Sequence, residues 1–392
     1  MKMKQRWLYT FLPFLIVASI WWGLASLAAV QANSAECPVP SVPHPTIQSA
    51  VADSNCHTIQ LTDPLYIENV TITRSVTIQG SGMYSTTVDG AASGTVFKIE
   101  PGLTVTITDM SVTNGSNTNG GGIHNMFSHL KLRQVQVFSN AGSYAGGGVF
   151  NDYNSILEIA NSAIHHNTAV IGGGVYNGGL VDISNSQMTI TGTVIYSNTA
   201  TSGSGGGFYN NLEALTNIAN STISLNKAGG LGGGLDNLGW INMMNVTING
   251  NDSPFGGGIF NSGQITVGNT IIANSLNGSN CVLSASINSI GHNLDSDDSC
   301  GLTTVGDITN TNPLLGPLQD TGGPTLTHDL LPNSPAQDAG DDIICQSAPV
   351  NGVDQRGVSR PQGPACDIGA FEKSAAGELP YKNYLPIVRR QE

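Results

Sequence analysis

Gly172-Gly173-Gly174-Val175-Tyr176-Asn177 (GGGVYN) is one of six copies of a single phrase, Gly-Gly-Gly-hydrophobic-x-Asn, in the middle of this 392-residue chain. Successive copies begin 26, 26, 33, 27 and 24 residues apart. The six copies are Gly120–Asn125, Gly146–Asn151, Gly172–Asn177, Gly205–Asn210, Gly232–Asn237 and Gly256–Asn261. A recurring period of this length is typical of solenoid proteins.

A second phrase, aliphatic-x-x-Asn, falls between the copies each time, as in Ile164–Asn167. The intervening residues are short alternating runs such as Ile156–Ile159, which favour strands with one apolar face. Three such strands cannot bury that face alone, whereas coils stacked about 4.8 Å apart share one core. The sequence therefore predicts an all-β fold, a single-stranded parallel β-helix with almost no α-helix.

The final Asn of each phrase recurs at a fixed place in every coil, so the side-chain amides are expected to stack into a ladder that bonds the coils above and below. We interpret this ladder as structural. Its members are Asn125, Asn151, Asn177, Asn210, Asn237 and Asn261. The glycines suit the tight corners before the strand, because glycine reaches positive φ without steric cost.

The residue before each Asn points to the opposite side of the strand from that Asn. This column reads His124, Phe150, Tyr176, Tyr209, Asp236 and Phe260. Aromatic rings on a solvent face can stack against sugar rings, so Phe150, Tyr176, Tyr209 and Phe260 are the predicted binding residues. The same column is also consistent with rings buried under a loop, or with favourable packing between strands.

Residues 1–32 are interpreted as a secretory signal peptide. They carry Lys2, Lys4 and Arg6, then an apolar stretch, then Val30-Gln31-Ala32 as a small-residue cleavage site. The apolar stretch is long enough to serve as a membrane anchor instead. With cleavage, the mature chain is expected to have no membrane span and to be secreted or held at the cell surface.

Six cysteines in an exported chain indicate disulfides. Fifteen connectivities are available, and the short segments between neighbours favour the sequential one, with the bridges closing the ends of the solenoid. The expected pairs are Cys37 with Cys56, Cys281 with Cys300, and Cys345 with Cys366. No C-x-x-C pair is present, so a metal site at these cysteines is not predicted.

The formal net charge is −13, and between Gln134 and Gln355 the only Lys or Arg is Lys227. Nucleic acid is therefore excluded as a partner. A surface rich in Asn, Ser, Thr and Gly fits a glycan or another component of a cell envelope better. The oligomeric state does not follow from the sequence.

The run Thr46–Val51, followed by Thr58–Leu61, Tyr66–Asn69 and Val76–Gly80, resembles the opening of pectate-lyase-like right-handed β-helix proteins. The resemblance implies a right-handed solenoid whose N-terminal cap, residues 33–66, carries a short helix at Ile47–Ala52 as a plug over the core. The repeats proper are then expected over residues 67–280.

Residues 281–372 contain four cysteines and segments such as Thr321–His328, Ser334–Asp341 and Cys366–Glu372. They are similar to the choice-of-anchor Q domain of bacterial surface proteins. The GGG phrases also resemble the repeats of polymorphic outer-membrane adhesins. Neither family implies a set of catalytic residues. Residues 373–392 resemble short sorting tails of exported bacterial proteins.

A polysaccharide lyase needs a basic residue near its substrate, and the central coils offer only Lys227. A glycosidase needs two carboxyl groups roughly 5 to 10 Å apart. Glu213 and Asp236, about one coil apart, are the best candidates for such a catalytic pair.

The run Asp295, Asp297 and Asp298 is a candidate Ca²⁺ loop, although a plain polar turn is the favoured interpretation, because an EF-hand's Gly and distal Glu are missing. No other metal or cofactor is expected.

The sequence thus predicts a secreted or cell-surface β-helix protein that acts in surface structure, adhesion or glycan binding without catalysis. The alternative is a polysaccharide-degrading enzyme, a lyase or a glycoside hydrolase, on the same scaffold. The two differ in whether a pair of acids converges in one groove.

Overall fold

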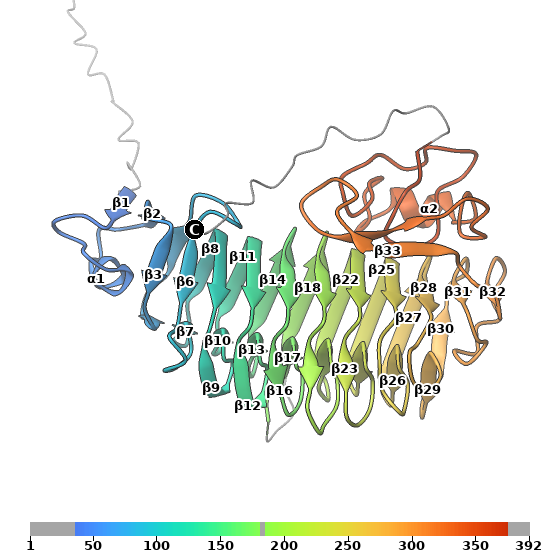
Figure 1. Cartoon of the computed structure of the whole chain (residues 1–392), viewed down its shortest axis with the longest axis horizontal. Helices are drawn as coiled ribbons and strands as arrows, with labels where there is room; N and C mark the ends of the chain where they lie inside the picture. The colour runs from blue at the N-terminus through green and yellow to red at the C-terminus, as the bar shows by residue number, and fades with distance from the viewer. Residues whose placement is uncertain (1–35, 181–184, 375–392) are drawn as a thin grey trace, which may run out of the picture. The chain divides into compact units, whose positions relative to one another are not determined.

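A computed structural model describes residues 36–180 and 185–374. The signal peptide predicted at residues 1–32 lies outside the described residues, as does all of the tail except Lys373 and Ser374. Between Glu36 and Thr309 the described residues form a parallel β-solenoid of about 10 turns, which confirms the predicted fold class. Figure 1 shows the coils following one another from β3 to β32. Among the described residues, no helix has the length and apolar character needed to cross a membrane.

In the largest sheet, sheet A, each coil contributes two consecutive stretches of strand, which are separated by a bend. Its eighteen strands are β1 (Glu36–Val39), β2 (Thr58–Leu61), β3 (Leu65–Ile67), β5 (Val76–Gln79), β6 (Thr87–Asp89), β8 (Thr104–Thr113), β11 (His129–Phe138), β14 (Ile156–Ala160), β15 (Ala163–His165), β18 (Gln187–Thr191), β19 (Val194–Tyr196), β22 (Leu215–Ser224), β25 (Trp240–Asn249), β27 (Gln264–Gly268), β28 (Ile271–Ala273), β30 (Ile287–Ser289), β31 (Leu294–Asp295) and β32 (Ile308–Thr309). Strands of this sheet therefore occur before and after residues 67–280, the range in which the sequence predicts the repeats.

Two smaller parallel sheets complete each coil. Sheet B, which contains the hydrophobic-x-Asn part of each repeat, consists of β4 (Val70–Ile72), β7 (Phe97–Ile99), β10 (Ile123–Asn125), β13 (Val149–Asn151), β17 (Val175–Asn177), β21 (Phe208–Asn210), β24 (Leu235–Asn237), β26 (Ile259–Asn261) and β29 (Cys281–Leu283). Sheet C consists of β9 (Ser116–Asn119), β12 (Ala141–Ala145), β16 (Thr168–Ala169), β20 (Thr199–Ala200) and β23 (Lys227–Ala228).

The bend in sheet A is made by one residue per coil in the left-handed region of φ. Glycine is best suited to this conformation, and asparagine tolerates it better than most other residues. Gly192 and several asparagines, Asn220 among them, hold these places. We call the part of sheet A before this bend the first arm, and the part after it the second arm.

Inward side chains of all three sheets form one continuous core, in which each aliphatic residue lies above its counterpart in the coil before. Leu157, Met188 and Ile241 are examples from the first arm, and each is at most 1% exposed. Outward residues alternate with them along every strand of this arm. The first arm therefore presents columns of side chains to solvent, one residue from each coil.

The Asn ladder forms in sheet B as the repeat indicates. Each Nδ2 donates to the Oδ1 of the Asn in the next coil, over distances of 2.8 to 3.0 Å from Asn125 to Asn261. The aliphatic-x-x-Asn phrases make a second buried ladder from Asn140 to Asn251. Asn274, at the end of the further phrase Ile271–Asn274, does not continue this ladder and donates to Asn249 instead.

The N-terminal end is capped as expected. Helix α1 (Ile47–Ala52) buries Ile47, Ala50 and Val51 against the core, and Thr46 caps its N-terminus by accepting from the Ser49 amide. The Cys37–Cys56 disulfide joins β1 to the end of this cap. Cys281–Cys300 closes the other end of the solenoid.

The sequential pairing of all six cysteines is confirmed, but the third bridge, Cys345–Cys366, does not lie at an end. After β32 the chain folds back as an irregular C-terminal region, residues 310–374, which lies along β22, β25 and β28 (Figure 1). It contains the antiparallel pair β33 (Leu315–Gln319) and β34 (Thr327–Leu330) and helix α2 (Asp342–Gln346). The third bridge lies beside the middle of the solenoid because residues far apart in the sequence are in contact there. The Asn245 side-chain amide, for example, donates to the carbonyls of Asp367 and Gly369.

Candidate functional site

The aromatic column predicted in sheet B is present, and its rings stack on one another. The ring centroids of Phe150 and Tyr176 lie 5.1 Å apart, as do those of Tyr176 and Tyr209. His124 meets the edge of Phe150 at 5.0 Å. The in-register pairing of the parallel strands places each ring above the last.

This column is not the open platform that the sequence predicts. Phe150 and Tyr176 are 1% and 3% exposed, and Ile171 and Leu180 pack against them. Tyr209 is only partly exposed. Because stacked rings use their faces on each other, little ring face is left for a sugar. Phe150 and Tyr176 instead fit the alternative interpretation of the column, in which the rings are buried inside the protein.

The column is interrupted at Asp236, which lies in register between Tyr209 and Phe260. The residue is 2% exposed, and its Oδ1 has no hydrogen-bond partner among the described residues. Burial raises the pKa of this carboxyl to about 7, although a hydrogen bond from Ser204 opposes the rise. Phe260 is partly exposed.

Glu213, the other half of the predicted acid pair, lies in a different place. It follows β21 in the turn that leads to β22 and adopts a φ of 59°. A non-glycine residue in this conformation is uncommon and marks a position worth inspecting for function. Asp236 lies on β24 of sheet B, whereas Glu213 lies in the turn between β21 and β22, and the hollow that Glu213 lines does not include Asp236.

Glu213 instead lines a surface hollow of about 350 Å³ on the outer side of the first arm. We call this hollow, lined by Asn185, Ser186, Gln187, Glu213, Leu215 and Trp240, the Trp240 hollow. Gln187, Leu215 and Trp240 are neighbours in one outward column of β18, β22 and β25. An indole, a carboxylate and an amide thus share one small concave surface.

The indole of Trp240 is 40% exposed, and no ring of the described residues stacks on it. The Glu213 carboxylate likewise accepts no hydrogen bond from a described side chain. The Trp240 hollow can therefore offer a ring face together with a free acceptor. The sequence pattern missed Trp240 because it begins the strand that follows a repeat phrase, and only the register puts it beside Gln187 and Glu213.

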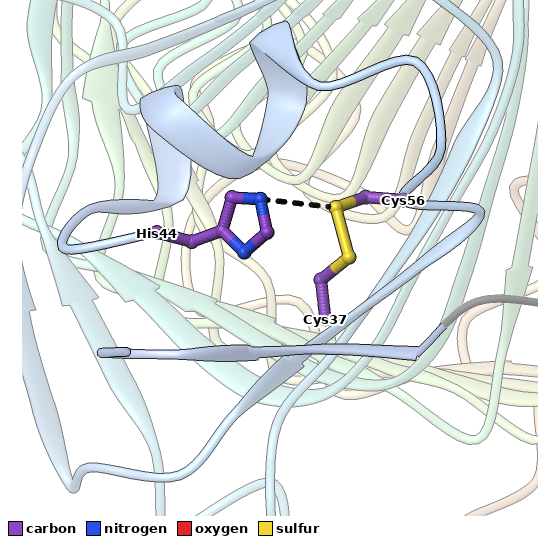
Figure 2. A group of neighbouring side chains, drawn as sticks. All are labelled: Cys37, His44 and Cys56. Carbon is purple, nitrogen blue, oxygen red and sulfur yellow. Dashed lines mark hydrogen bonds between the residues drawn. A yellow bond between two sulfur atoms is a disulfide. The ribbon is translucent and has the colours of Figure 1, made fainter. Parts of the chain in front are cut away.

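Among the described residues, one group of three potential metal ligands has its donor atoms within 4.8 Å of one another, namely Cys37, His44 and Cys56. Figure 2 shows the imidazole of His44 directed at the disulfide, with Nε2 3.4 Å from the Cys56 sulfur. The same Nε2 lies 3.0 Å from Asp53 Oδ2. Because both sulfurs are already bonded to each other, the group packs and orients the cap rather than offering two thiolates.

The predicted Ca²⁺ residues are engaged with the protein's own donors. Asp295 accepts from Asn280 Nδ2 and the Cys300 amide, and Asp297 accepts from the Asn280 amide and Ser299. These bonds tie the loop to the Cys281–Cys300 bridge. Burial raises the pKa of the Asp295 carboxyl, whereas hydrogen bonds, led by that from Ser299, lower the pKa of Asp297. Asp298 adopts a φ of 64° in the same turn.

Lys227, the one basic residue of the central coils, forms an ion pair with Asp252 at 2.9 Å. Its side chain is 64% exposed, on β23 of sheet C. It does not line any of the described cavities.

No protein-family model and no curated protein matches this chain. Among solved structures, the chain is similar to the crystal structure of pectate lyase Pel9A, with a TM-score of 0.53 and 15% sequence identity. The match covers 88% of this chain and 98% of that one. At this level of identity the likeness concerns the fold alone: this chain shares the pectate-lyase-like parallel β-helix.

Proposed function

We propose that this chain is an exported β-helix protein that binds glycans without cleaving them, and that the Trp240 hollow is its principal binding site. The observation that carries the proposal is the meeting of an unstacked indole, a free carboxylate and an amide in one hollow of about 350 Å³. A ring face for the apolar side of a sugar, with convergent acceptors and donors for its hydroxyl groups, is the chemistry that sugar binding requires.

A non-catalytic role is supported by the separation of the acids. Glu213 lines the Trp240 hollow alone among carboxylates, while Asp236 lies in sheet B with Tyr209 and Phe260. A hydrolase would need a second carboxyl group within reach of the same sugar. A lyase would need a base there, and Lys227 is paired with Asp252.

Export and attachment to a cell surface belong to the same proposal. Three disulfides fit an oxidising compartment. The apolar segment within residues 1–32 is proposed as the signal, and residues 281–372 as the part that resembles choice-of-anchor Q domains.

The test is a glycan array probed with purified residues 33–392 and with its Trp240→Ala variant. The wild type should bind a subset of glycans, and the variant should lose about tenfold or more in affinity. Stacking of a nucleic-acid base on an aromatic ring is worth about 1 to 3 kcal/mol, and we expect a sugar ring packed on the indole to lose a contact of about this size. Phe255→Ala, which removes a ring that is 54% exposed elsewhere, is the matched control and should bind normally.

Each glycan that binds is then incubated with the protein, and reducing ends and unsaturated products are measured. Binding without product supports the proposal. Product formation would establish the enzyme instead, and an array without any bound glycan would reject a glycan-binding function.

A further inference from the structure

Two more hollows lie on the outer side of the first arm beyond the Trp240 hollow. The middle one, of about 410 Å³, is lined by Thr189, Asn217, Asn242, Met244, Ala348 and Pro349, and we call it the Asn217 hollow. The last one, of about 360 Å³, lies at the bend of sheet A and includes Thr191, Gly192, Asn220, Pro349 and Val350; we call it the Asn220 hollow.

The three hollows follow one another along the strands. On β18, Gln187, Thr189 and Thr191 line the Trp240, Asn217 and Asn220 hollows in turn. Alternate residues of a strand are about 6.6 Å apart, so the positions on β18 that line the three hollows span roughly 13 Å. Pro349 lines both the second and the third, which joins them.

β22 repeats the same order. Leu215 lines the Trp240 hollow, Asn217 the next and Asn220 the last. The sequence of hollows is therefore a property of neighbouring coils in register and not of one loop. We call the three together the outer track.

The outer track carries little free charge, and most of the surface that lines it is apolar. Asn217 accepts from Asn242 Nδ2 at 2.9 Å, and these amides lie beside the hydroxyl of Thr189. Besides Glu213, its charged members are Asp354 and Arg356 in the Asn220 hollow. These two are paired at 2.7 Å, with side chains 0% and 5% exposed. A polyanion would find no unpaired cation here, because the Arg356 charge is already balanced.

Asn220 supplies the observation that points to a ligand. It is 6% exposed and lines the last hollow, yet its Oδ1 has no hydrogen-bond partner in the described protein. Its Nδ2 donates to the Val350 carbonyl at 3.1 Å, which holds the amide plane in place. A buried carbonyl oxygen left without a donor is unfavourable. The Asn220 Oδ1 exposes less than 1 Å², so a hydroxyl group of a bound molecule would satisfy it after a small outward movement of the wall of the hollow.

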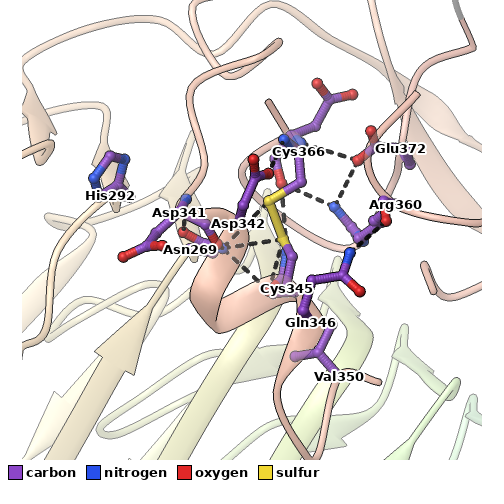
Figure 3. Close-up of a disulfide and its surroundings, with 12 residues drawn as sticks. Asn269, His292, Asp341, Asp342, Cys345, Gln346, Val350, Arg360, Cys366 and Glu372 are labelled. Atoms are coloured by element: carbon purple, nitrogen blue, oxygen red, sulfur yellow. Dashed lines mark hydrogen bonds and ion pairs between the residues drawn. A yellow bond between two sulfur atoms is a disulfide. The ribbon is translucent and has the colours of Figure 1, made fainter. Parts of the chain in front are cut away.

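The far wall of the outer track comes from the C-terminal region, which is held firmly against the solenoid. Figure 3 shows α2 and the Cys345–Cys366 bridge beside Asn269, with Val350 below the helix. The Asn269 amide donates to the Asp341 carbonyl at 3.0 Å, and Gln346 donates to the Arg360 carbonyl at 2.6 Å. The hollows therefore exist before any ligand arrives.

We propose that the outer track binds a linear, uncharged polysaccharide laid along the strands, with successive sugars in the Trp240, Asn217 and Asn220 hollows. This inference rests on the proposed function and adds the class of glycan, its direction and the residues at the far end. The C-terminal region thereby becomes part of the binding site.

The experiment is calorimetric titration of residues 33–392 with disaccharides, tetrasaccharides and hexasaccharides of linear β-1,4-linked glucose, mannose and xylose. For at least one of these series, the hexasaccharide should bind about tenfold or more tightly than the disaccharide, because it fills further hollows. A hexagalacturonate should bind at least about tenfold more weakly than the neutral hexasaccharide, since its charges would lose water without gaining partners.

Thr189→Arg places a long, charged side chain in the middle of the outer track at an exposed position, where folding is not at risk. It should reduce hexasaccharide affinity by about tenfold or more, because the arginine side chain occupies the middle of the three hollows. The matched control is Thr106→Arg, in the same outward column three coils earlier. The control should bind like the wild type.

Asn220→Gly removes the unpartnered acceptor while keeping a residue suited to the positive φ of 46°. We expect about a fivefold loss of hexasaccharide affinity, the value of one neutral hydrogen bond, with no loss for the disaccharide. Asn154→Gly, at an exposed turn with a φ of 49°, is the control for the glycine itself. Thermal unfolding of both variants establishes that they are folded.

The failures are distinguishable. Equal affinity for disaccharide and hexasaccharide, or hexagalacturonate binding as tightly as the neutral chain, overturns the outer track but leaves the Trp240 hollow as a binding site. Absence of binding to every array glycan and every oligosaccharide overturns the proposed function and this inference together.

Discussion

Replacing Asp236 by Asn should change how the stability of the protein depends on pH. The carboxyl is 2% exposed between Tyr209 and Phe260, and burial raises its pKa to about 7 from the ordinary 3.8. The folded state therefore holds the proton more tightly than the unfolded state does. The protonated carboxyl therefore contributes its full share to the free energy of unfolding below about pH 4, and this contribution is lost as the pH rises to 7.

The magnitude follows from the two pKa values. One pKa unit corresponds to about 1.4 kcal/mol, so the change from 3.8 to about 7 amounts to about 4 kcal/mol of unfolding free energy. Asn resembles the protonated carboxyl in shape and does not titrate. Asp236→Asn should thus match the wild type near pH 4 and exceed its stability by about 4 kcal/mol near pH 8.

The assay is guanidinium chloride unfolding, followed by tryptophan fluorescence and circular dichroism, at five pH values from 4 to 8. Asp63→Asn, at an exposed position, is the control for the change of side chain. The control curve should run parallel to that of the wild type. If the Asp236→Asn curve also runs parallel to it, burial does not hold the proton on Asp236, and our reading of this site is wrong.

Three further predictions concern stability. Asn177→Ala should lower the free energy of unfolding by about 3 kcal/mol in denaturant titrations, because it removes buried bonds to both neighbouring coils; a loss below about 1 kcal/mol would contradict the ladder's role. Cys345→Ser with Cys366→Ser should cost about 3 kcal/mol, and limited proteolysis should then cut the C-terminal region first; unchanged cleavage would refute this. Arg360→Met should lower the free energy of unfolding by about 3 to 5 kcal/mol in thermal and denaturant unfolding. It leaves Glu372, which is 3.0 Å away and also fully buried, without its partner. If Arg360→Lys has wild-type stability, the charge of residue 360 matters and the geometry of the guanidinium does not.

The sequence was a sufficient guide to the repeating part of the fold. The spacing of the GGG phrases, the Asn at the end of each and the alternating runs between them predict stacked coils. Helix α1 at Ile47–Ala52 and the pairing of the six cysteines are as expected, although the third bridge lies away from the ends of the solenoid. These features are periodic or local. Each coil repeats the same register, so one correct strand fixes the neighbours.

The candidate site was not predictable in the same way. Phe150 and Tyr176 face outward as the alternation requires, yet residues outside their own strands, Ile171 and Leu180, cover them. Glu213 and Asp236 are about one coil apart in sequence and still lie on different elements. Sequence periodicity gives the side of a strand on which a side chain lies, but not what packs over it.

By itself, then, the sequence determined the solenoid, its core, its ladders and the pairing of its cysteines, because all of these depend on short-range patterns repeated from coil to coil. Only the tertiary structure decided that residues 310–374 fold back along the bend and the second arm of sheet A, and that Trp240, Asn217 and Asn220 line one track of hollows. The physical reason is that the Asn217 and Asn220 hollows form between the sheet and a non-repeating region more than a hundred residues away, and that the Trp240 hollow brings together side chains from successive coils. Contacts of that kind leave no period in the sequence.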